Sequence, residues 1–169
     1  FVYRAQTEGE TMLVMAGIHG DEINGVETVR RTIHEGLFTK IKRGTVIVVP
    51  LLNIFGFLNF SREVPDGKDV NRSFPGVKNG SLAARVAYAL SNEILQHVDF
   101  GVDFHTGGSS RYNYPQIRYT KGDKNAEALA NVFAAPYTIA SSTIKGSLRR
   151  TAADMNIPML VFEGGESTR

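Results

Sequence analysis

Runs of apolar, β-branched residues alternate along this chain with segments whose apolar residues recur at helical spacing. Residues 11–16 and 45–52 have the composition of buried strands. Between them, residues 23–35 carry apolar side chains about one helical turn apart, and Gly36 follows where a helix C-cap is expected. This alternation predicts an α/β layer fold with a largely parallel sheet. Ligands of such sheets bind beyond the carboxyl ends of the strands, so residues at those ends are the first candidates for a site.

The rest of the chain continues the alternation, apart from one long stretch rich in glycine and proline. That stretch, residues 53–80, is predicted to be a loop, and its polar residues between aromatic ones favour a functional role. The remaining predicted elements are helices over residues 81–98, 123–134 and 147–155, and strands over residues 100–104, 116–119, 137–140 and 158–162.

The composition is that of an ordinary globular protein. The chain has 169 residues, of which 42% are hydrophobic and 21% charged, and its formal net charge is +2. We predict a single domain over residues 1–169, because this length suits one compact core. Near-balanced charge without a basic block gives no support for nucleic-acid or membrane binding. No apolar run approaches the roughly 18 residues of a transmembrane helix, and no signal-peptide pattern opens the chain.

Cysteine is absent from the chain. Disulfides and thiolate ligands are therefore excluded, and a metal site must be built from His, Asp, Glu or water. The absence of cysteine also fits a reducing compartment, and we predict a cytoplasmic location.

His19 and Glu22 stand three positions apart, where the first predicted strand gives way to a helix. At that spacing an imidazole and a carboxylate can reach one point and bind zinc, although taken alone a surface histidine and a helix-capping glutamate explain them better. His105 follows another predicted strand and adds a third ligand, with Asp103 on the same side. Two histidines and one carboxylate form the zinc set of thermolysin and carboxypeptidase A, with a fourth position for water. We predict one Zn²⁺ per chain, bound by these three residues.

Glu163 directly follows four apolar residues of the last predicted strand. A carboxylate near a core is costly without a partner, and here it could act as a general base toward water. Considered alone, an ordinary strand-end glutamate that faces solvent is an equal alternative. Glu166 competes for the role of base, but it lies farther from the strand, so we predict Glu163.

The predicted loop contributes Asn71 and Arg72. An arginine binds a carboxylate through two parallel hydrogen bonds and an asparagine can add another, so this pair could hold a substrate carboxylate. On their own, the two residues are better explained as a loop-stabilising asparagine beside a solvated arginine. Arg62 is a second cation of the loop that could stabilise an oxyanion, while an ion pair with Glu63 explains it nearly as well.

Other polar residues are less informative. His34 and His97 fall at predicted helix ends, where the helix dipole favours a cation, and both are interpreted as structural. Four residues that follow the Gly107-Gly108 turn are candidates for lining a pocket, with no decision among them: Arg111, Tyr112, Tyr114 and Arg118.

Four segments, in this order and spacing, resemble the zinc carboxypeptidase superfamily and, more narrowly, the succinylglutamate desuccinylase/aspartoacylase family. They are His19-Gly20-Asp21-Glu22, Asp69-Val70-Asn71-Arg72-Ser73-Phe74-Pro75-Gly76, Asp103-Phe104-His105-Thr106 and Phe162-Glu163-Gly164-Gly165. Any one segment is a weak signal, whereas four in order are specific. The resemblance spans residues 12–166 and implies a three-layer, zinc-carboxypeptidase-like α/β fold. The sheet is expected to be mixed, mostly parallel and flanked by helices, with at least one antiparallel strand.

The resemblance also implies a role for each candidate residue. The zinc ligands are matched by His19, Glu22 and His105. Glu163 matches the general base, and Arg62 matches the arginine that stabilises the oxyanion. Substrate-carboxylate binding is matched by Asn71 and Arg72.

Two features depart from the family pattern. Members usually carry a further C-terminal segment, often β-rich, that helps to shape the pocket, and it is missing here. Because the chain also begins at Phe1 rather than Met, we expect it to be a fragment. In addition, the segment Asn53-Ile54-Phe55-Gly56 lacks the proline that often follows this asparagine in relatives.

Three functions stay open at this stage. The resemblance favours a zinc-dependent hydrolase (a deacylase) that cleaves the amide bond of an N-acyl amino acid or a related small acyl amine. A metallocarboxypeptidase that acts on peptide C-termini is the close alternative. The third is a non-catalytic module that binds zinc or another ligand. The sequence predicts neither the acyl group nor the oligomeric state.

Overall fold

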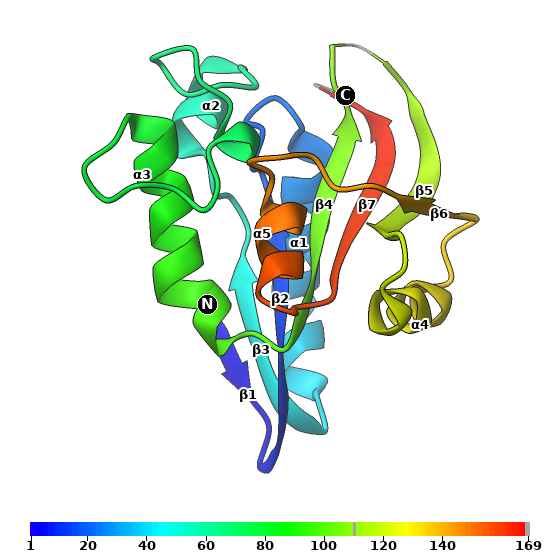
Figure 1. The fold of residues 1–169 in the computed structure, drawn as a ribbon. Helices are drawn as coiled ribbons and strands as arrows, with labels where there is room; N and C mark the ends of the chain where they lie inside the picture. Colours follow the sequence, from blue (N-terminus) through cyan, green and yellow to red (C-terminus); the bar gives the residue numbers. More distant parts are fainter. Residues whose placement is uncertain (110, 168–169) are drawn as a thin grey trace.

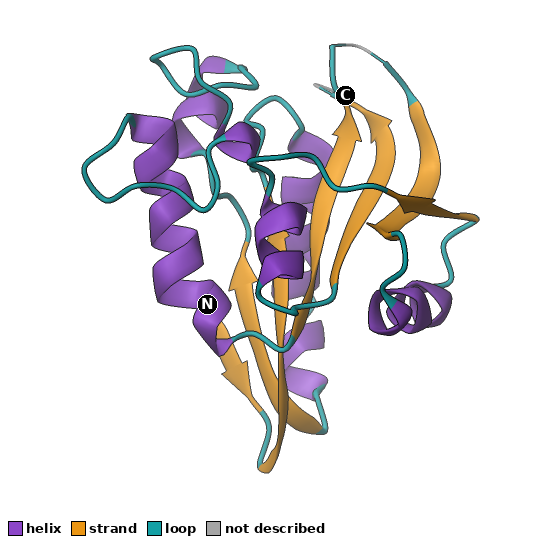
Figure 2. Ribbon diagram, in the orientation of Figure 1, coloured by secondary structure: helices purple, strands orange, loops and turns teal. Residues whose placement is uncertain are grey.

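The structure, a computed structural model that describes residues 1–109 and 111–167, is built on a seven-stranded sheet between helices (Figures 1 and 2). The strands are β1 (Val2–Arg4), β2 (Thr7–Ala16), β3 (Arg43–Val49), β4 (Phe100–Gly107), β5 (Asn113–Thr120), β6 (Tyr137–Ser141) and β7 (Met159–Glu166). The α-helices are α1 (Ile23–His34), α2 (Ile54–Asn59), α3 (Leu82–Ala89), α4 (Lys124–Phe133) and α5 (Leu148–Asp154). Within the described residues, no helix combines the length and apolar character needed to cross a membrane.

The sheet is parallel at its centre and antiparallel toward its two edges. Its strand order is β1-β3-β2-β4-β7-β5-β6. The four strands from β3 to β7 in this order run parallel to one another. β1 is antiparallel to β3 and β5 is antiparallel to β7, while β6 runs parallel to β5. The expected mixed, mostly parallel sheet is therefore confirmed.

Each face of the sheet is covered by its own hydrophobic core, because side chains alternate along the strands. On β2, Leu13 and Met15 are fully buried in the core that α3 and α5 cover. Val14 and Ala16 lie in the opposite core, beneath α1 and α4. Figure 1 shows α5 in front of the central strands and α1 behind them. The result is the expected three-layer α/β architecture.

The segment 53–80 is not a loop throughout, so this prediction is wrong in part. It contains α2 and a 3₁₀ turn, Val70–Arg72. The side chain of Asn53 caps α2 by accepting a hydrogen bond from Gly56 N at 2.9 Å. Helical periodicity could not predict α2, because this helix is only six residues long and leaves apolar side chains such as Leu58 exposed.

The other predicted elements are confirmed with shifted boundaries. Ser81, Asp123 and Ser147 each cap a helix with the side chain, as expected. The helix predicted over residues 81–98 is α-helical only to Ala89 and continues as π and 3₁₀ turns to His97. Strands β4 and β7 extend past the predicted ends. His105 and Glu163 consequently lie inside strands rather than after them.

Candidate metal centre and active site

Three buried side chains meet at the carboxyl ends of the central strands. His19 Nδ1 lies 2.7 Å from Glu22 Oε1, and His105 Nδ1 lies 2.9 Å from Glu22 Oε2. The three residues are 3%, 2% and 4% exposed, in the order His19, Glu22, His105. One ligand atom from each lies within 4.8 Å of the others. The structure thus brings together the residues that were predicted as metal ligands.

The turn that follows β2 is shaped to place His19 and Glu22. A side chain at Gly20 would overlap the backbone of Gly56, so only glycine allows α2 to pack against this turn. Asn53, which is fully buried, fixes the start of α2 and donates a 3.3 Å hydrogen bond to Arg62 O. The segment that the sequence left as loop therefore packs directly against the candidate ligands.

Two further carboxylates contact the outer nitrogens of the histidines. His105 Nε2 lies 2.8 Å from Asp103 Oδ2, and donation of its N–H to Asp103 would free the Nδ1 lone pair for a metal ion. His19 Nε2 is buried and lies 3.3 Å from Asp69 Oδ1, within ion-pair distance but without hydrogen-bond geometry. A carboxylate behind the imidazole is the usual arrangement around metal-binding histidines, because it fixes the tautomer and the orientation of the ring.

The charges of this group favour a bound cation. With neutral histidines, the carboxylates of Glu22, Asp69 and Asp103 contribute −3 and the adjacent Arg62 guanidinium contributes +1, which leaves −2. Burial opposes ionisation of Glu22, but hydrogen bonds from His105 and His19 outweigh it and hold the pKa of Glu22 well below its usual range. Burial also lowers the pKa of His105, yet Asp103 and Glu22 reverse this and raise it well above its usual value. The group thus stabilises positive charge, carried by protons or by a metal ion.

Arg62 lies against the same cluster. Its Nε and Nη2 donate to Asp69 Oδ2 at 3.1 and 3.0 Å, and its Nη1 lies 3.4 Å from Glu22 Oε1. Within the described part of the chain, Arg62 forms ion pairs with Glu22 and Asp69 rather than the pair with Glu63 that the sequence left open. Glu63 instead accepts from Ser61 Oγ at 3.2 Å. Arg62 is thereby held beside the candidate metal ligands.

Glu163 reaches the site from β7. It pairs with His105 in the register of the two parallel strands, and its Oε2 accepts a 2.8 Å hydrogen bond from Asn113 Nδ2. Burial raises the pKa of Glu163, while the positive charges of His105 and Arg118 partly oppose this effect. Glu166, the competing candidate, does not line the cavity at the site, whereas Glu163 does.

A cavity of about 420 Å³ connects these groups. Asn71 and Arg72 line it, as do the cluster residues and Glu163. Asn71 Oδ1 accepts a 2.9 Å hydrogen bond from Leu148 N, which leaves the amide nitrogen as its donor toward a ligand. Arg72 is exposed and donates to Asn71 O at 2.6 Å. All seven residues of the sequence-derived site thus meet at one cavity.

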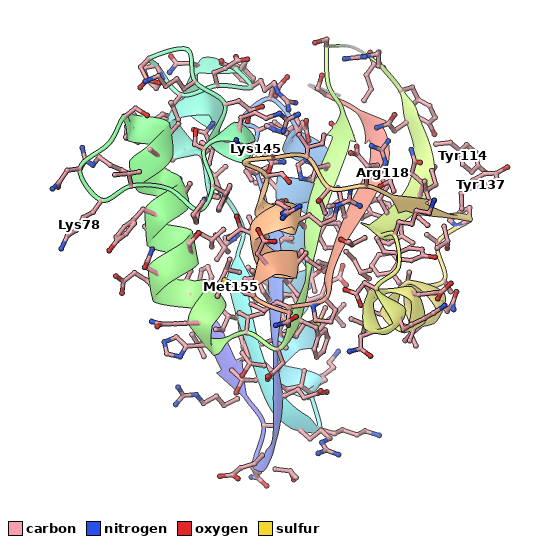
Figure 3. The ribbon with its side chains drawn as sticks, viewed as in Figure 1. Lys78, Tyr114, Arg118, Tyr137, Lys145 and Met155 are labelled. Carbon is pink, nitrogen blue, oxygen red and sulfur yellow. The ribbon has the colours of Figure 1, made fainter. Side chains whose placement is uncertain are left out.

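The residues after the Gly107-Gly108 turn divide into two groups. Arg111 and Arg118 line the cavity, whereas Tyr112 and Tyr114 are 65% and 58% exposed and do not. Figure 3 shows Tyr114 beside Tyr137 at the outer edge of the sheet, and their ring centroids are 5.5 Å apart. His34 and His97 are exposed and lie outside the cavity, in agreement with a structural interpretation.

Arg149 also lines the cavity, although the sequence did not predict it as a site residue. Its Nη2 donates to Ser141 Oγ and Ser142 O at 3.0 and 2.9 Å. Its Nη1 is buried without a hydrogen-bond partner among the described residues. Burial, together with the charge of Arg118, lowers the pKa of Arg149. The only available signal was its position in the first turn of a capped helix, which does not reveal the direction of the side chain.

Fold and site together define a class: α/β proteins with the carboxypeptidase-like fold, in which a His-Glu-His cluster sits at the ends of parallel strands. Residues 8–169 match the model of the succinylglutamate desuccinylase/aspartoacylase catalytic domain. The chain belongs to the succinylglutamate desuccinylase/aspartoacylase family. The resemblance inferred from the four sequence segments is therefore confirmed.

Individual relatives agree with this assignment. The chain is 31% identical over 138 residues to N-alpha-acetyl-L-2,4-diaminobutyric acid deacetylase of Halomonas elongata. This match covers 78% of the chain and 40% of the relative. A succinylglutamate desuccinylase from Silicibacter sp. TM1040 superposes with a TM-score of 0.86 at 25% identity, over 95% of this chain and 51% of that one. The product-bound ectoine utilization protein EutE (DoeB) from Ruegeria pomeroyi superposes with a TM-score of 0.83 at 26% identity, over 95% of this chain and 51% of that one. The chain thus spans between 40% and 51% of the length of these relatives.

Proposed function

We propose that this chain carries the active site of a zinc-dependent hydrolase that cleaves the amide bond of an N-acyl amino acid or a related small acyl amine. One observation carries the proposal. The buried His19–Glu22–His105 cluster and the Glu163 carboxylate open onto one cavity that several arginines also line. The Halomonas relative is a deacetylase and the Silicibacter relative a desuccinylase, which supports the same chemistry.

The residues present fit a zinc ion. Two imidazoles and one carboxylate are the donor types that zinc prefers, and the remaining charge of the cluster favours a divalent cation. Zn²⁺ held by His19, Glu22 and His105 would supply Lewis-acid polarisation of the amide carbonyl and activation of water at neutral pH.

Glu163 would move the proton. As the water oxygen forms its bond to the carbonyl carbon, the carboxylate accepts the proton that the water loses. When the carbon–nitrogen bond breaks, Glu163 passes this proton to the departing amine. Its raised pKa suits both steps, because the group is more basic than an ordinary glutamate.

Two arginines and an asparagine would orient the substrate and stabilise charge. Arg62, fixed by Asp69 beside the cluster, would donate a hydrogen bond to the oxyanion that develops on the carbonyl oxygen. Asn71 and Arg72 would bind a carboxylate of the substrate and so direct the amide toward the cluster.

The arginine content of the cavity supports an anionic substrate. Among the described residues, five arginines line it: Arg62, Arg72, Arg111, Arg118 and Arg149. An N-acyl amino acid presents a free carboxylate next to the scissile amide, which matches this charge.

The single domain over residues 1–169 and the cytoplasmic location remain predictions from composition.

A substrate panel tests the proposal. The zinc-loaded protein is assayed on N-acetyl and N-succinyl amino acids, and in parallel on peptides with free C-termini. We expect turnover of at least one acyl amino acid and loss of that turnover in the Glu163→Gln variant. Exclusive turnover of peptides would establish a carboxypeptidase. Stoichiometric zinc without turnover of either class, tested also in the intact-length protein, would establish a non-catalytic module.

A further inference from the structure

β5 places a hydrogen-bond donor against one carboxylate oxygen of Glu163 and a cation near the other. Asn113 Nδ2 donates to Oε2 at 2.8 Å, and Arg118 Nη1 lies 3.7 Å from Oε1. We propose that Asn113 and Arg118 are positioning residues, which hold the Glu163 carboxylate in the orientation that proton transfer requires. The inference rests on the proposed hydrolase function and adds a role for β5 in positioning the general base.

This arrangement requires a break in the regular alternation of β5. Successive side chains of a strand point to opposite faces, so Asn113 and Arg118, five positions apart, are expected on opposite faces. Both nevertheless approach Glu163. Tyr114, which regular alternation would place on the same face as Arg118, lies instead at the outer edge beside Tyr137, as Figure 3 shows.

A bulge around Pro115 provides the break. Asn113 pairs with Gly165 and Gln116 pairs with Glu163, so β5 contains two residues in an interval where β7 contains one. Proline lacks a backbone N–H, and inside a sheet it is tolerated at such a bulge. Bulges are frequent beside active sites, where they redirect a side chain. Here the bulge turns Asn113 toward the same carboxylate as Arg118.

The two donors contribute differently. Asn113 fixes the orientation of the Glu163 carboxylate, because its 2.8 Å hydrogen bond restrains the otherwise broad terminal torsion of the Glu163 side chain. Arg118 provides charge at longer range, and 38% of its side chain is exposed. A catalytic base displaced by about 1 Å can lose on the order of 10²-fold in rate, so a restraint on the carboxylate matters for turnover. Neither side chain needs to contact the substrate for this effect.

The experiment is a double-mutant cycle on zinc-loaded protein with four members: wild type, Asn113→Leu, Glu163→Ala and the double variant. We expect Asn113→Leu to lower kcat about 10-fold in the wild-type background, with KM and bound zinc unchanged. In the Glu163→Ala background, assayed at high enzyme concentration, the same substitution is expected to have no effect, because the group it positions is gone. An equal fold-loss in both backgrounds would overturn the proposal.

Two comparisons control for structural damage. Asn125→Leu, at an exposed position of α4, is the matched substitution and is expected to leave kcat unchanged. Arg118→Lys is expected to retain most of the activity that Arg118→Met loses, because lysine keeps the charge. Equal losses in these two Arg118 variants would contradict the role assigned to this charge.

Urea unfolding of the same four proteins supplies a readout that does not depend on activity. We expect Asn113→Leu to shift the unfolding midpoint more when Glu163 is present than in the Glu163→Ala background, since the two side chains are in contact. Additive shifts would contradict the contact. If wild type hydrolyses nothing in the substrate panel, the proposed function fails, and this unfolding cycle still decides whether Asn113 holds Glu163.

Discussion

Glu163 lies directly opposite His105 in the parallel pairing of β7 and β4. The candidate base and one candidate metal ligand therefore come from neighbouring central strands, and the sheet rather than a loop sets their relative position. The register shifts only beyond this pair, between His105 and Gly107, where β7 contains Gly165 with a positive φ of 83°. Sites built on strands are held more accurately than sites built on loops, which suits a base that must meet the substrate at a defined distance.

Glu163→Gln is expected to lower kcat by about 10²- to 10⁴-fold, because glutamine keeps the shape of the side chain but cannot accept the proton. Bound zinc should stay at the wild-type level, since Glu163 is not one of the predicted ligands. Steady-state kinetics and metal analysis of the same preparation check both parts. Retained activity, or loss of zinc with the substitution, would disprove the assignment of Glu163 as base.

The pH dependence of activity follows from the raised pKa of Glu163. Burial is the main cause of the rise, and the base must be ionised to accept a proton. Activity should therefore increase with pH through this raised pKa, so the acid limb of kcat/KM lies above the ordinary glutamate value of 4.5. The measurement is kcat/KM against pH, and an acid limb at or below 4.5 would contradict the expected environment of Glu163.

The same shift has a consequence for stability. Because the folded protein holds this proton more tightly than the unfolded chain, the free energy of unfolding should fall as pH rises from the ordinary pKa through the raised one. Glu163→Gln removes the titrating group and should remove this part of the fall. Urea unfolding of wild type and variant across this pH range tests the sign, and identical slopes would contradict it.

Asp103→Asn is expected to weaken zinc binding by about 10- to 100-fold, because the carboxylate behind His105 fixes the tautomer that presents Nδ1 to the metal. Zinc affinity is measured by competition with a chelator. Asp154→Asn, an exposed residue of α5, is the matched control and should bind zinc like wild type. Equal affinities for the Asp103 variant and wild type would show that this contact does not support the metal site.

Arg72→Ala is expected to raise KM by about 10-fold or more for an acyl amino acid, since a charge-assisted hydrogen bond to its carboxylate is lost. The corresponding carboxamide substrate, which lacks the charge, should be affected much less. Arg85→Ala, at an exposed position of α3, serves as the control. An equal change for both substrates would argue against carboxylate binding by Arg72.

The sequence predicted the central architecture because the strong signals are local. Strand segments such as residues 11–16 of β2 and helix caps such as Ser147 have composition and spacing that depend little on distant residues. It did not predict α2, whose exposed apolar side chains give no amphipathic pattern, or the short edge strand β1. Both depend on tertiary contacts, β1 through its pairing with β3.

The candidate ligands were found because a His and a Glu in one short turn, with a second His at a strand end, limit the possible chemistry. The carboxylate of Asp69 was harder to find, because it meets His19 only after residues 53–80 fold over the site. Asn113 was missed for a similar reason. Its direction depends on a register shift at Pro115, and alternation counted along the sequence does not reveal such a shift.

The most direct test of the account is metal analysis of the purified protein alongside the His19→Ala variant. Because His19 is a buried member of the cluster and supplies one of its three candidate ligand atoms, we expect about one zinc per wild-type chain and little or none in the variant. His34→Ala, which alters an exposed histidine outside the site, should match wild type. Zinc content unchanged by His19→Ala would contradict the site on which the proposed hydrolase function depends.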